Sequence, residues 1–185
     1  MDAETYITSH WIPRRVWTHL AWPRHQERLR RCAELMPPAG RVLDVGCACG
    51  HSTEIMRRFR PELEWSGADF SRTGITMAAV FFKHMKFYLV PQPNDLSNVG
   101  KFDGVVCSEV LEHTPDDGAL VDALIQVAAG TLVMTTPWAR VSDPGHLRVY
   151  TEEALLALFA KPGHPGTLRI EREDKFFYLV YARER

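Results

Sequence analysis

The sequence lacks a surplus of either charge, because 22 lysine and arginine residues stand against 23 aspartate and glutamate residues, for a formal net charge of −1. Without a basic surplus, bulk electrostatics provide no attraction to nucleic acid or to an acidic membrane surface. The chain also lacks an apolar run of membrane-spanning length and an apolar signal-peptide core at its N-terminus. We therefore expect a small-molecule substrate rather than nucleic acid and no membrane partner, with the oligomeric state left open.

Cysteine is scarce, and none of the four cysteines belongs to a C-x-x-C pair. This spacing argues against the disulfide framework of a small secreted protein and against a four-thiolate metal site. Cys47 and Cys49 lie one residue apart with no second pair, so we interpret them as packing residues of a turn. Reduced thiols and a cytoplasmic location are expected for this 185-residue chain.

The most informative stretch is residues 42–53, VLDVGCACGHST. Its apolar beginning predicts a buried strand, its small residues a tight turn, and Ser52 or Thr53 the cap of a following helix. A strand, a glycine turn and a helix N-terminus bind nucleotide-like ligands at the carboxyl edge of a parallel sheet. Gly46 and Gly50 allow close approach of a ligand, and Asp44 suits an ammonium group but repels a pyrophosphate.

The spacing D-x-G-x-A-x-G in this stretch resembles the first motif of the class I S-adenosylmethionine-dependent methyltransferases. Ala48 departs from the pattern, since the family usually has glycine there, and alanine disfavours a positive φ. The resemblance implies S-adenosyl-L-methionine as the methyl donor and S-adenosyl-L-homocysteine as the product. It also implies that the cofactor is bound by Asp44, Gly46, Cys47, Ala48, Gly50, Asp69, Phe70, Gln92, Asp95 and Ser108.

Beyond the turn, Asp69 follows Gly50 by nineteen residues, at the end of a second expected strand. A carboxylate at this place can accept hydrogen bonds from both hydroxyls of a ribose. The resemblance implies that Phe70 packs on the adenine. Two alignments are open for the acceptor of the adenine amino group, one choosing Gln92 and the other Asp95.

The pattern of apolar residues predicts an alternation of strands and helices. Strands are expected at 42–45, 63–69, 86–90, 102–108 and 131–136, with helices at 26–36, 52–59, 73–82, 116–129 and 152–159. An antiparallel hairpin of strands 168–171 and 176–182 closes the run. The fold class is therefore α/β, a Rossmann-like seven-stranded mixed sheet with helices on both faces. We expect a methyltransferase domain over residues 40–185 and an N-terminal helical cap over residues 1–39.

The cap segment is rich in arginine (14, 15, 24, 28, 30 and 31) and tryptophan (11, 17 and 22). One interpretation is a flap that closes over the ligand and offers arginine to a carboxylate or an anionic substrate. The other is a solvated helix with its tryptophans packed on the sheet. For any single arginine the solvated helix is favoured, and a capping role for the segment stays open.

Methyl transfer from a sulfonium is an in-line displacement, so the protein mainly positions the reactants and sometimes supplies a base. His113 and His146 are the candidate catalytic residues, because both follow strands at the carboxyl edge. A structural role in orienting the loops is the alternative for each. The predicted function is methyl transfer to an oxygen, nitrogen or carbon atom of a small molecule.

Two rival functions are considered. The order E-x-x-E-H…H of Glu109, Glu112, His113 and His146 resembles the metal-ligand set of the small-RNA 3′-terminal 2′-O-methyltransferases, which implies Mg²⁺ or Mn²⁺ and an RNA acceptor. The chain has no added RNA-binding domain, and we predict that it binds no metal. The other rival is a non-catalytic methyltransferase-like binding subunit, favoured by Ala48 and by the lack of a clear adenine-binding aspartate.

Overall fold

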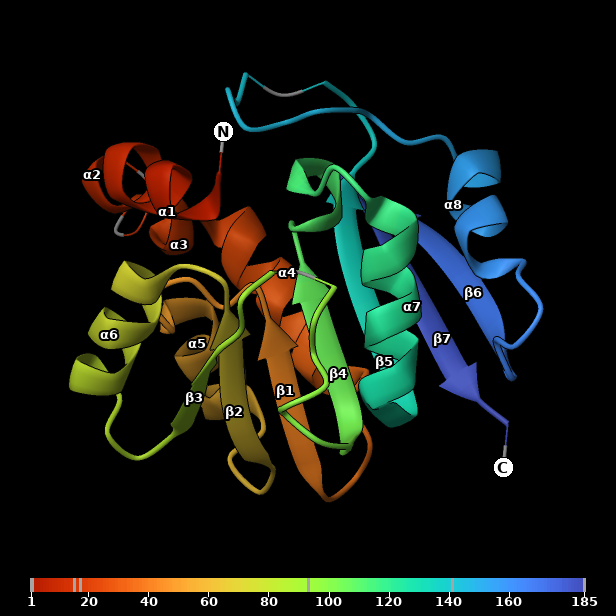
Figure 1. Ribbon diagram of the computed structural model, residues 1–185, viewed down its shortest axis with the longest axis horizontal. Helices are drawn as coiled ribbons and strands as arrows, with labels where there is room; N and C mark the ends of the chain where they lie inside the picture. Colours follow the sequence, from red (N-terminus) through yellow and green to blue (C-terminus); the bar gives the residue numbers. More distant parts are fainter. Residues whose placement is uncertain (1, 15, 17, 93, 141, 185) are drawn as a thin grey trace.

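The computed structural model describes residues 2–14, 16, 18–92, 94–140 and 142–184. Its strands are β1 (Arg41–Val45), β2 (Glu64–Asp69), β3 (Lys86–Leu89), β4 (Phe102–Ser108), β5 (Ala128–Pro137), β6 (Gly166–Glu173) and β7 (Phe176–Arg183). They form one sheet in the order β3-β2-β1-β4-β5-β7-β6 (Figure 1). Strands β1 to β5 pair parallel, whereas β7 pairs antiparallel with both β5 and β6. The expected mixed sheet with an antiparallel C-terminal hairpin is confirmed.

Helices surround this sheet. They are α1 (Ala3–Tyr6), the π-helix η1 (Ile7–Trp11), α2 (Ile12–Arg14), α3 (Thr18–Ala21), α4 (Pro23–Glu34), α5 (His51–Phe59), α6 (Arg72–Phe81), the 3-10 helix η2 (Leu111–His113), α7 (Asp117–Val127) and α8 (Glu152–Phe159). Across the part of the chain that the structure describes, no helix combines the length and the apolar character needed to cross a membrane.

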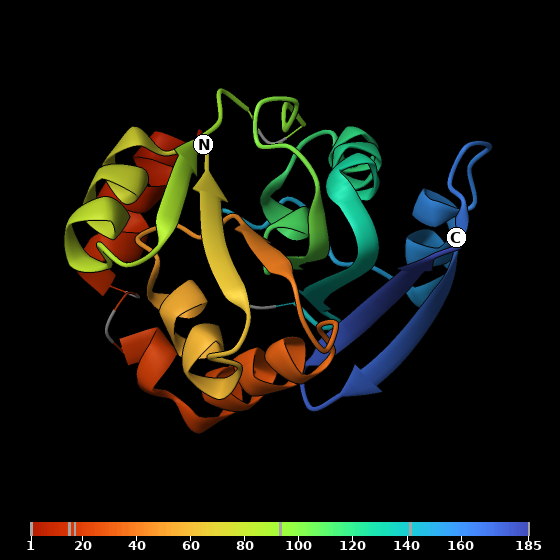
Figure 2. The same ribbon diagram turned by 90° about the horizontal axis from the view of Figure 1, so that it is seen from below.

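Both faces of the sheet are covered, as the view from below shows (Figure 2). On one face, Leu29 of α4 and Met56 of α5 join the apolar side chains of the central strands. On the other, Leu124 of α7 and Leu155 of α8 do the same. A strand covered on both faces needs apolar residues on both faces rather than alternation, which is why β1 contains Val42, Leu43 and Val45.

The helix caps agree only in part with expectation. Thr151 caps α8 as expected, since its hydroxyl accepts a hydrogen bond from Ala154 N at 3.3 Å. The expected cap of α5 by Ser52 or Thr53 is wrong, because Gly50 is the N-cap residue and α5 has no side-chain cap. Gly50 has a φ of 78°, which a glycine adopts without a steric cost. The two hydroxyls instead contact a buried carboxylate of β1, described below.

The short N-terminal helices lie at the end of the sheet to which β1 and β4 point, as does the loop between β5 and α8 (Figure 1). Ligand sites of open α/β sheets form at this carboxyl edge. Arg15 and Trp17 of the expected cap fall outside the described residues. The rest of the segment is therefore in position to contact whatever occupies the edge.

All four cysteines are free thiols and buried. Cys47 and Cys49 lie in the turn after β1, while Cys32 lies on α4 and Cys107 on β4. Burial raises the pKa of Cys49 to about 11, and that of Cys32 to about 12. These thiols act as small apolar side chains, in line with the packing role expected for the turn cysteines.

Candidate functional site

A cavity of about 740 Å³ opens at the carboxyl edge of the sheet. It extends from the turn after β1 to the loop after β5, beneath the N-terminal segment. Eight residues predicted for the site line it: Gly46, Ala48, Asp69, Phe70, Gln92, Ser108, His113 and His146. Asp44, Cys47, Gly50 and Asp95, which were also predicted, are not among the lining residues. The cavity thus joins the two ends of the expected site.

The turn after β1 has backbone conformations that explain its small residues. Gly46 has a φ of 82°, and a Cβ there would lie 2.2 Å from Val110 Cγ2, so no larger residue fits. Ala48 also has a positive φ, 48°, which strains a residue with a Cβ. The backbone N–H of Ala48 donates to Asp69 Oδ2 at 2.8 Å, and this bond holds the strained turn against β2.

Asp44 lies beneath this turn and is 2% exposed. Its Oδ2 accepts hydrogen bonds from the Thr53 hydroxyl at 2.6 Å and from the Ser52 hydroxyl at 3.3 Å. Burial raises the pKa of Asp44 to about 6, and the two hydroxyls oppose that shift. In this structure Asp44 therefore joins the end of β1 to the first turn of α5 instead of facing the cavity.

Asp69 ends β2 and lines the cavity, although it is only 3% exposed. Its carboxylate accepts hydrogen bonds from Ala48 N at 2.8 Å and from Ser71 N at 2.7 Å. Burial raises the pKa of Asp69 to about 6, against the effect of these N–H groups. Each carboxylate oxygen has two lone pairs, so both oxygens keep capacity for a further donor.

Gln92 and Asp95 occupy different positions in the loop after β3. Gln92 lines the cavity, whereas Asp95 accepts a hydrogen bond from the Ser97 hydroxyl at 2.7 Å. Ser108, at the end of β4, lines the cavity and shares a 2.8 Å hydrogen bond with the Thr135 hydroxyl. The geometry thus favours Gln92 over Asp95 as a group facing a ligand.

Glu109 follows β4 in a left-handed conformation, with a φ of 59°. Such a conformation is strained for a residue other than glycine, and it turns the Glu109 carboxylate into the cavity wall. The carboxylate accepts from the Thr135 hydroxyl at 3.1 Å and lies 3.5 Å from Arg28 Nη1. Burial raises the pKa of Glu109, while the nearby Arg28 guanidinium opposes the rise.

Arg28 of α4 also lines the cavity and is 4% exposed. Its Nη1 lies 3.0 Å from His25 Nδ1, and its guanidinium carbon lies 4.8 Å from the centre of the Phe176 ring. The Nε of Arg28 is buried and has no hydrogen-bond partner among the residues that the structure describes. Arg30 and Arg31, by contrast, pair with acidic side chains outside the cavity. The cationic-flap and solvated-helix interpretations therefore apply to different arginines of one helix.

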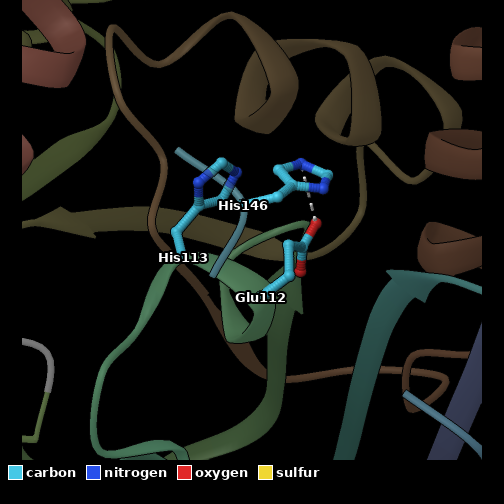
Figure 3. Close-up of side chains that lie close together, drawn as sticks. All are labelled: Glu112, His113 and His146. Atoms are coloured by element: carbon cyan, nitrogen blue, oxygen red, sulfur yellow. Dashed lines mark ion pairs between the residues drawn. The ribbon is translucent and has the colours of Figure 1, made fainter. Parts of the chain in front are cut away.

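Glu112, His113 and His146 converge on one point, although His146 comes from the loop after β5 (Figure 3). One potential ligand atom from each lies within 4.8 Å of the others. The two imidazole rings are perpendicular, with centroids 4.6 Å apart, and His146 Nε2 lies 3.9 Å from Glu112 Oε1. Glu109 stands apart from this group. The expected set of four is thus divided into a cluster of three and one carboxylate beside Arg28.

The cluster is buried, which disfavours charge on its members. Burial and the neighbouring His146 lower the pKa of His113 to about 4. Burial also raises the pKa of Glu112 well above its usual value, with Glu109 adding to the effect. The Thr136 hydroxyl donates to Glu112 Oε2 at 3.1 Å, while Oε1 accepts no hydrogen bond within the described part of the chain. An open oxygen beside two imidazoles suits either a proton relay or a cation.

Sequence reasoning missed several lining residues, among them Tyr6, Ile7 and Asp143. Tyr6 and Ile7 belong to helices of four and five residues, which are too short for a periodic pattern to identify them. Asp143 lies in the loop before His146, where its Oδ1 accepts from Gly145 N at 2.8 Å. Only the nearby His146 indicated this loop, since a single aspartate in a loop carries no specific signal.

Comparisons with known proteins bear on these features. Residues 17–165 match the model of a methyltransferase domain family. Ubiquinone biosynthesis O-methyltransferases are similar: that of Psychrobacter arcticus is 30% identical over 135 residues, covering 68% of this chain and 50% of the relative. That of Thiobacillus denitrificans is 32% identical over 144 residues, covering 74% and 61%. The chain spans about half the length of the first curated relatives that it matches.

Among solved structures, the N-methyltransferase NodS of Bradyrhizobium japonicum, in complex with S-adenosyl-L-homocysteine, has a TM-score of 0.71. It is 20% identical, and the match covers 91% of this chain and 92% of NodS, which supports the fold. The family model covers most of the sequence, including every residue of the cavity turn. The chain therefore belongs to the methyltransferase domain family, as its resemblance to the class I S-adenosylmethionine-dependent methyltransferases indicated.

Proposed function

We propose that this chain binds S-adenosyl-L-methionine in the cavity and transfers its methyl group to an oxygen atom of a small molecule. The observation that carries the proposal is the continuity of the cavity from Asp69 to His146. A donor bound at one end would face the imidazoles at the other. The names of the curated relatives support an oxygen acceptor, and the lack of a basic surplus supports a small molecule over RNA. A cytoplasmic location is part of the proposal.

The polar groups of the cavity fit the parts of this donor. Asp69 would accept hydrogen bonds from the ribose hydroxyls, Gln92 would face the adenine amino group, and Phe70 would pack on the ring. Gly46 and Ala48 line the cavity, so the donor would pass close to the backbone of this turn. Asp44 and Gly50 would act indirectly, by holding the turn in shape.

Arg28 provides what the amino-acid end of the donor needs. A carboxylate in a buried site requires a cation, and the Nε of Arg28 is open for a hydrogen bond. Glu109, 3.5 Å from Arg28 Nη1, would restrain the guanidinium and face the donor's ammonium group. We assign Arg28 to the site on this geometry.

When bound, the donor supplies an activated methyl group that an acceptor oxygen displaces in line. The protein contributes position and a place for the acceptor proton. His146 lines the cavity, and burial keeps its neighbour His113 neutral near pH 7. We therefore propose that His146 takes the proton and that His113 and Glu112 hold its ring.

Titration calorimetry with S-adenosyl-L-homocysteine tests the proposal directly. Micromolar binding to the wild-type protein, weakened by Asp69→Asn and Arg28→Gln, is expected. Glu27→Gln is the matched control, because Glu27 is an exposed acid of the same helix α4 that pairs with Arg30 outside the cavity. A wild-type protein that does not bind at millimolar ligand would favour the non-catalytic subunit.

A second candidate is the same transfer assisted by a divalent cation. The convergence of one carboxylate and two imidazoles favours it, as does the open oxygen of Glu112. Glu112, His113 and His146 would hold the cation, which would polarise the acceptor hydroxyl. Calorimetry with Mn²⁺ alone, on wild type and Glu112→Gln, separates the candidates. If the wild type binds Mn²⁺, Glu112→Gln does not, and a chelator abolishes activity, the cation-assisted mechanism holds in place of the base mechanism.

A further inference from the structure

The N-terminal residues 2–11, here called the strap, cross the cavity from one half to the other. Asp2, Glu4, Tyr6, Ile7 and Trp11 line it from this side. In Figure 1 α1 lies beside α6, and contacts between the two helices confirm this placement. The strap therefore covers part of the cavity from the N-terminal side.

Glu4 fastens the strap to the N-terminus of α6. Its carboxylate accepts hydrogen bonds from the Ser71 hydroxyl at 2.7 Å, from Thr73 N at 3.3 Å and from the Thr73 hydroxyl. These bonds lower the pKa of Glu4, so the carboxylate is ionised near pH 7. A negative charge also suits this position, because the first turn of a helix presents free N–H groups.

The Glu4 contact is connected to the floor of the cavity. Ser71, which Glu4 binds, also caps α6 by accepting from Gly74 N at 3.0 Å. The backbone N–H of Ser71 donates to Asp69. The strap is thus one hydrogen-bonded residue away from the carboxylate to which the proposed function assigns the ribose.

The strap is fastened at a second place, to the loop after β5. The Tyr6 hydroxyl donates to Asp143 Oδ2 at 3.1 Å, and His10 Nε2 lies 3.5 Å from the same oxygen. The Tyr6 ring packs on His113 with centroids 4.9 Å apart. Gly145 is required here, since a Cβ would lie 2.7 Å from His113 Nδ1 and 2.9 Å from the Tyr6 ring.

We infer that the strap is a closing element held by two latches, Glu4 on Ser71 and Thr73 and Tyr6 on Asp143. One latch lies beside Asp69 and the other beside His113, so closure of the strap involves contacts at both halves of the cavity. The strap must release for ligand exchange, and a ligand that contacts Asp69 holds it closed. This last consequence rests on the proposed function, whereas the latches themselves do not.

Hydrogen–deuterium exchange of the ligand-free protein tests the latches. Glu4→Ala should accelerate exchange of the amides of residues 4–11 about tenfold or more, the scale expected for loss of several charge-assisted hydrogen bonds. Tyr6→Phe, which keeps the ring on His113, should accelerate the same amides to a lesser degree. Glu27→Ala removes an equal charge from α4 and should leave the strap unchanged.

Thr73→Val removes one partner hydroxyl from the other side of the latch and should act in the same direction as Glu4→Ala but less strongly, because the Ser71 hydroxyl still donates to Glu4. Exchange at the wild-type rate in both variants would overturn the inference. Addition of S-adenosyl-L-homocysteine should slow strap exchange in the wild type and less so in Glu4→Ala. A wild-type protein that does not bind this ligand contradicts the proposed function alone, because the ligand-free rates still judge the latches.

Discussion

Replacement of Asp69 by asparagine should separate ligand affinity from stability. The variant keeps the size of the side chain and one carbonyl oxygen, but it loses the charge and half of the acceptor capacity. Loss of charge-assisted hydrogen bonds to the ribose should cost about 1.5–3 kcal/mol of binding free energy. The dissociation constant for S-adenosyl-L-homocysteine should therefore rise by one to two orders of magnitude.

The stability of the free protein should respond differently. At pH 7 the ionised Asp69 is unfavourable, because burial raises its pKa from 3.8 to about 6, which corresponds to about 3 kcal/mol at 1.36 kcal/mol per pH unit. Asparagine removes this cost but leaves one buried N–H, that of Ala48 or Ser71, without an acceptor, for about 1–3 kcal/mol. The two effects nearly cancel at pH 7.

Stability and ligand affinity should depend on pH in opposite directions. A raised folded-state pKa means that the contribution of Asp69 to stability is present below about pH 4 and is lost as the pH rises through about 6. Asp69→Asn should therefore be less stable than wild type at pH 4.5 and about equal at pH 7. The wild-type affinity should fall as the pH drops below about 6, by at most tenfold per pH unit, because the ribose favours the ionised carboxylate.

Calorimetric titration with S-adenosyl-L-homocysteine at several pH values between 5 and 8 measures the affinity, and urea unfolding at the same values measures stability. Wild-type affinity should show the pH dependence and the variant should not. Parallel affinity profiles for the two proteins, or an unchanged dissociation constant at pH 7, would refute the assignment of Asp69 to the ribose.

Three further changes test other parts of the site. Ala48→Gly removes the strain of a φ of 48° but adds backbone entropy to the unfolded chain. We therefore expect the variant to be more stable by about 1 kcal/mol or less in urea unfolding. A loss of stability would show that the Ala48 methyl group makes favourable packing contacts. His146→Ala should reduce turnover about a hundredfold with little change in donor affinity, while the exposed His84→Ala should behave as wild type in both assays. Arg28→Gln should weaken the binding of S-adenosyl-L-homocysteine about tenfold or more in calorimetry. The binding of methylthioadenosine, which lacks the amino-acid end, should not change. Equal losses of affinity for both ligands would contradict the role given to Arg28.

The sheet could be predicted from the sequence because its strands carry their own signal. Continuous apolar runs identify the central strands, and the apolar and β-branched residues of 176–182 identify the closing hairpin. The bounds differ where the signal is weak. Strand β5 begins at Ala128, directly after α7, although Ala128, Ala129 and Gly130 favour no strand. Pairing with β4 determines this extension, and pairing is a tertiary contact.

Polar side chains were harder to assign, because their partners are distant in sequence. Thr53 resembles a helix cap in sequence, yet its hydroxyl serves Asp44, nine residues earlier. The same kind of contact joins Glu4 to Thr73 and Tyr6 to Asp143. The left-handed conformation of Glu109 has no sequence signature either, since it depends on the hydrogen bonds that the surrounding structure imposes. A local motif can be recognised in the sequence, whereas these contacts between distant residues cannot.

The four buried thiols lie at positions where their rates of chemical modification can measure how often the surrounding structure opens. A thiol with a raised pKa and no access to solvent reacts with an alkylating reagent only when the surrounding structure opens. Cys32 and Cys107, within the two packed faces of the sheet, should become modified only at the rate of global unfolding. Cys47 and Cys49 belong to the turn itself, so their modification should be faster and should record each local opening. An alkylation time course followed by mass spectrometry would then measure the rate at which the ligand turn opens, without any substitution in the chain.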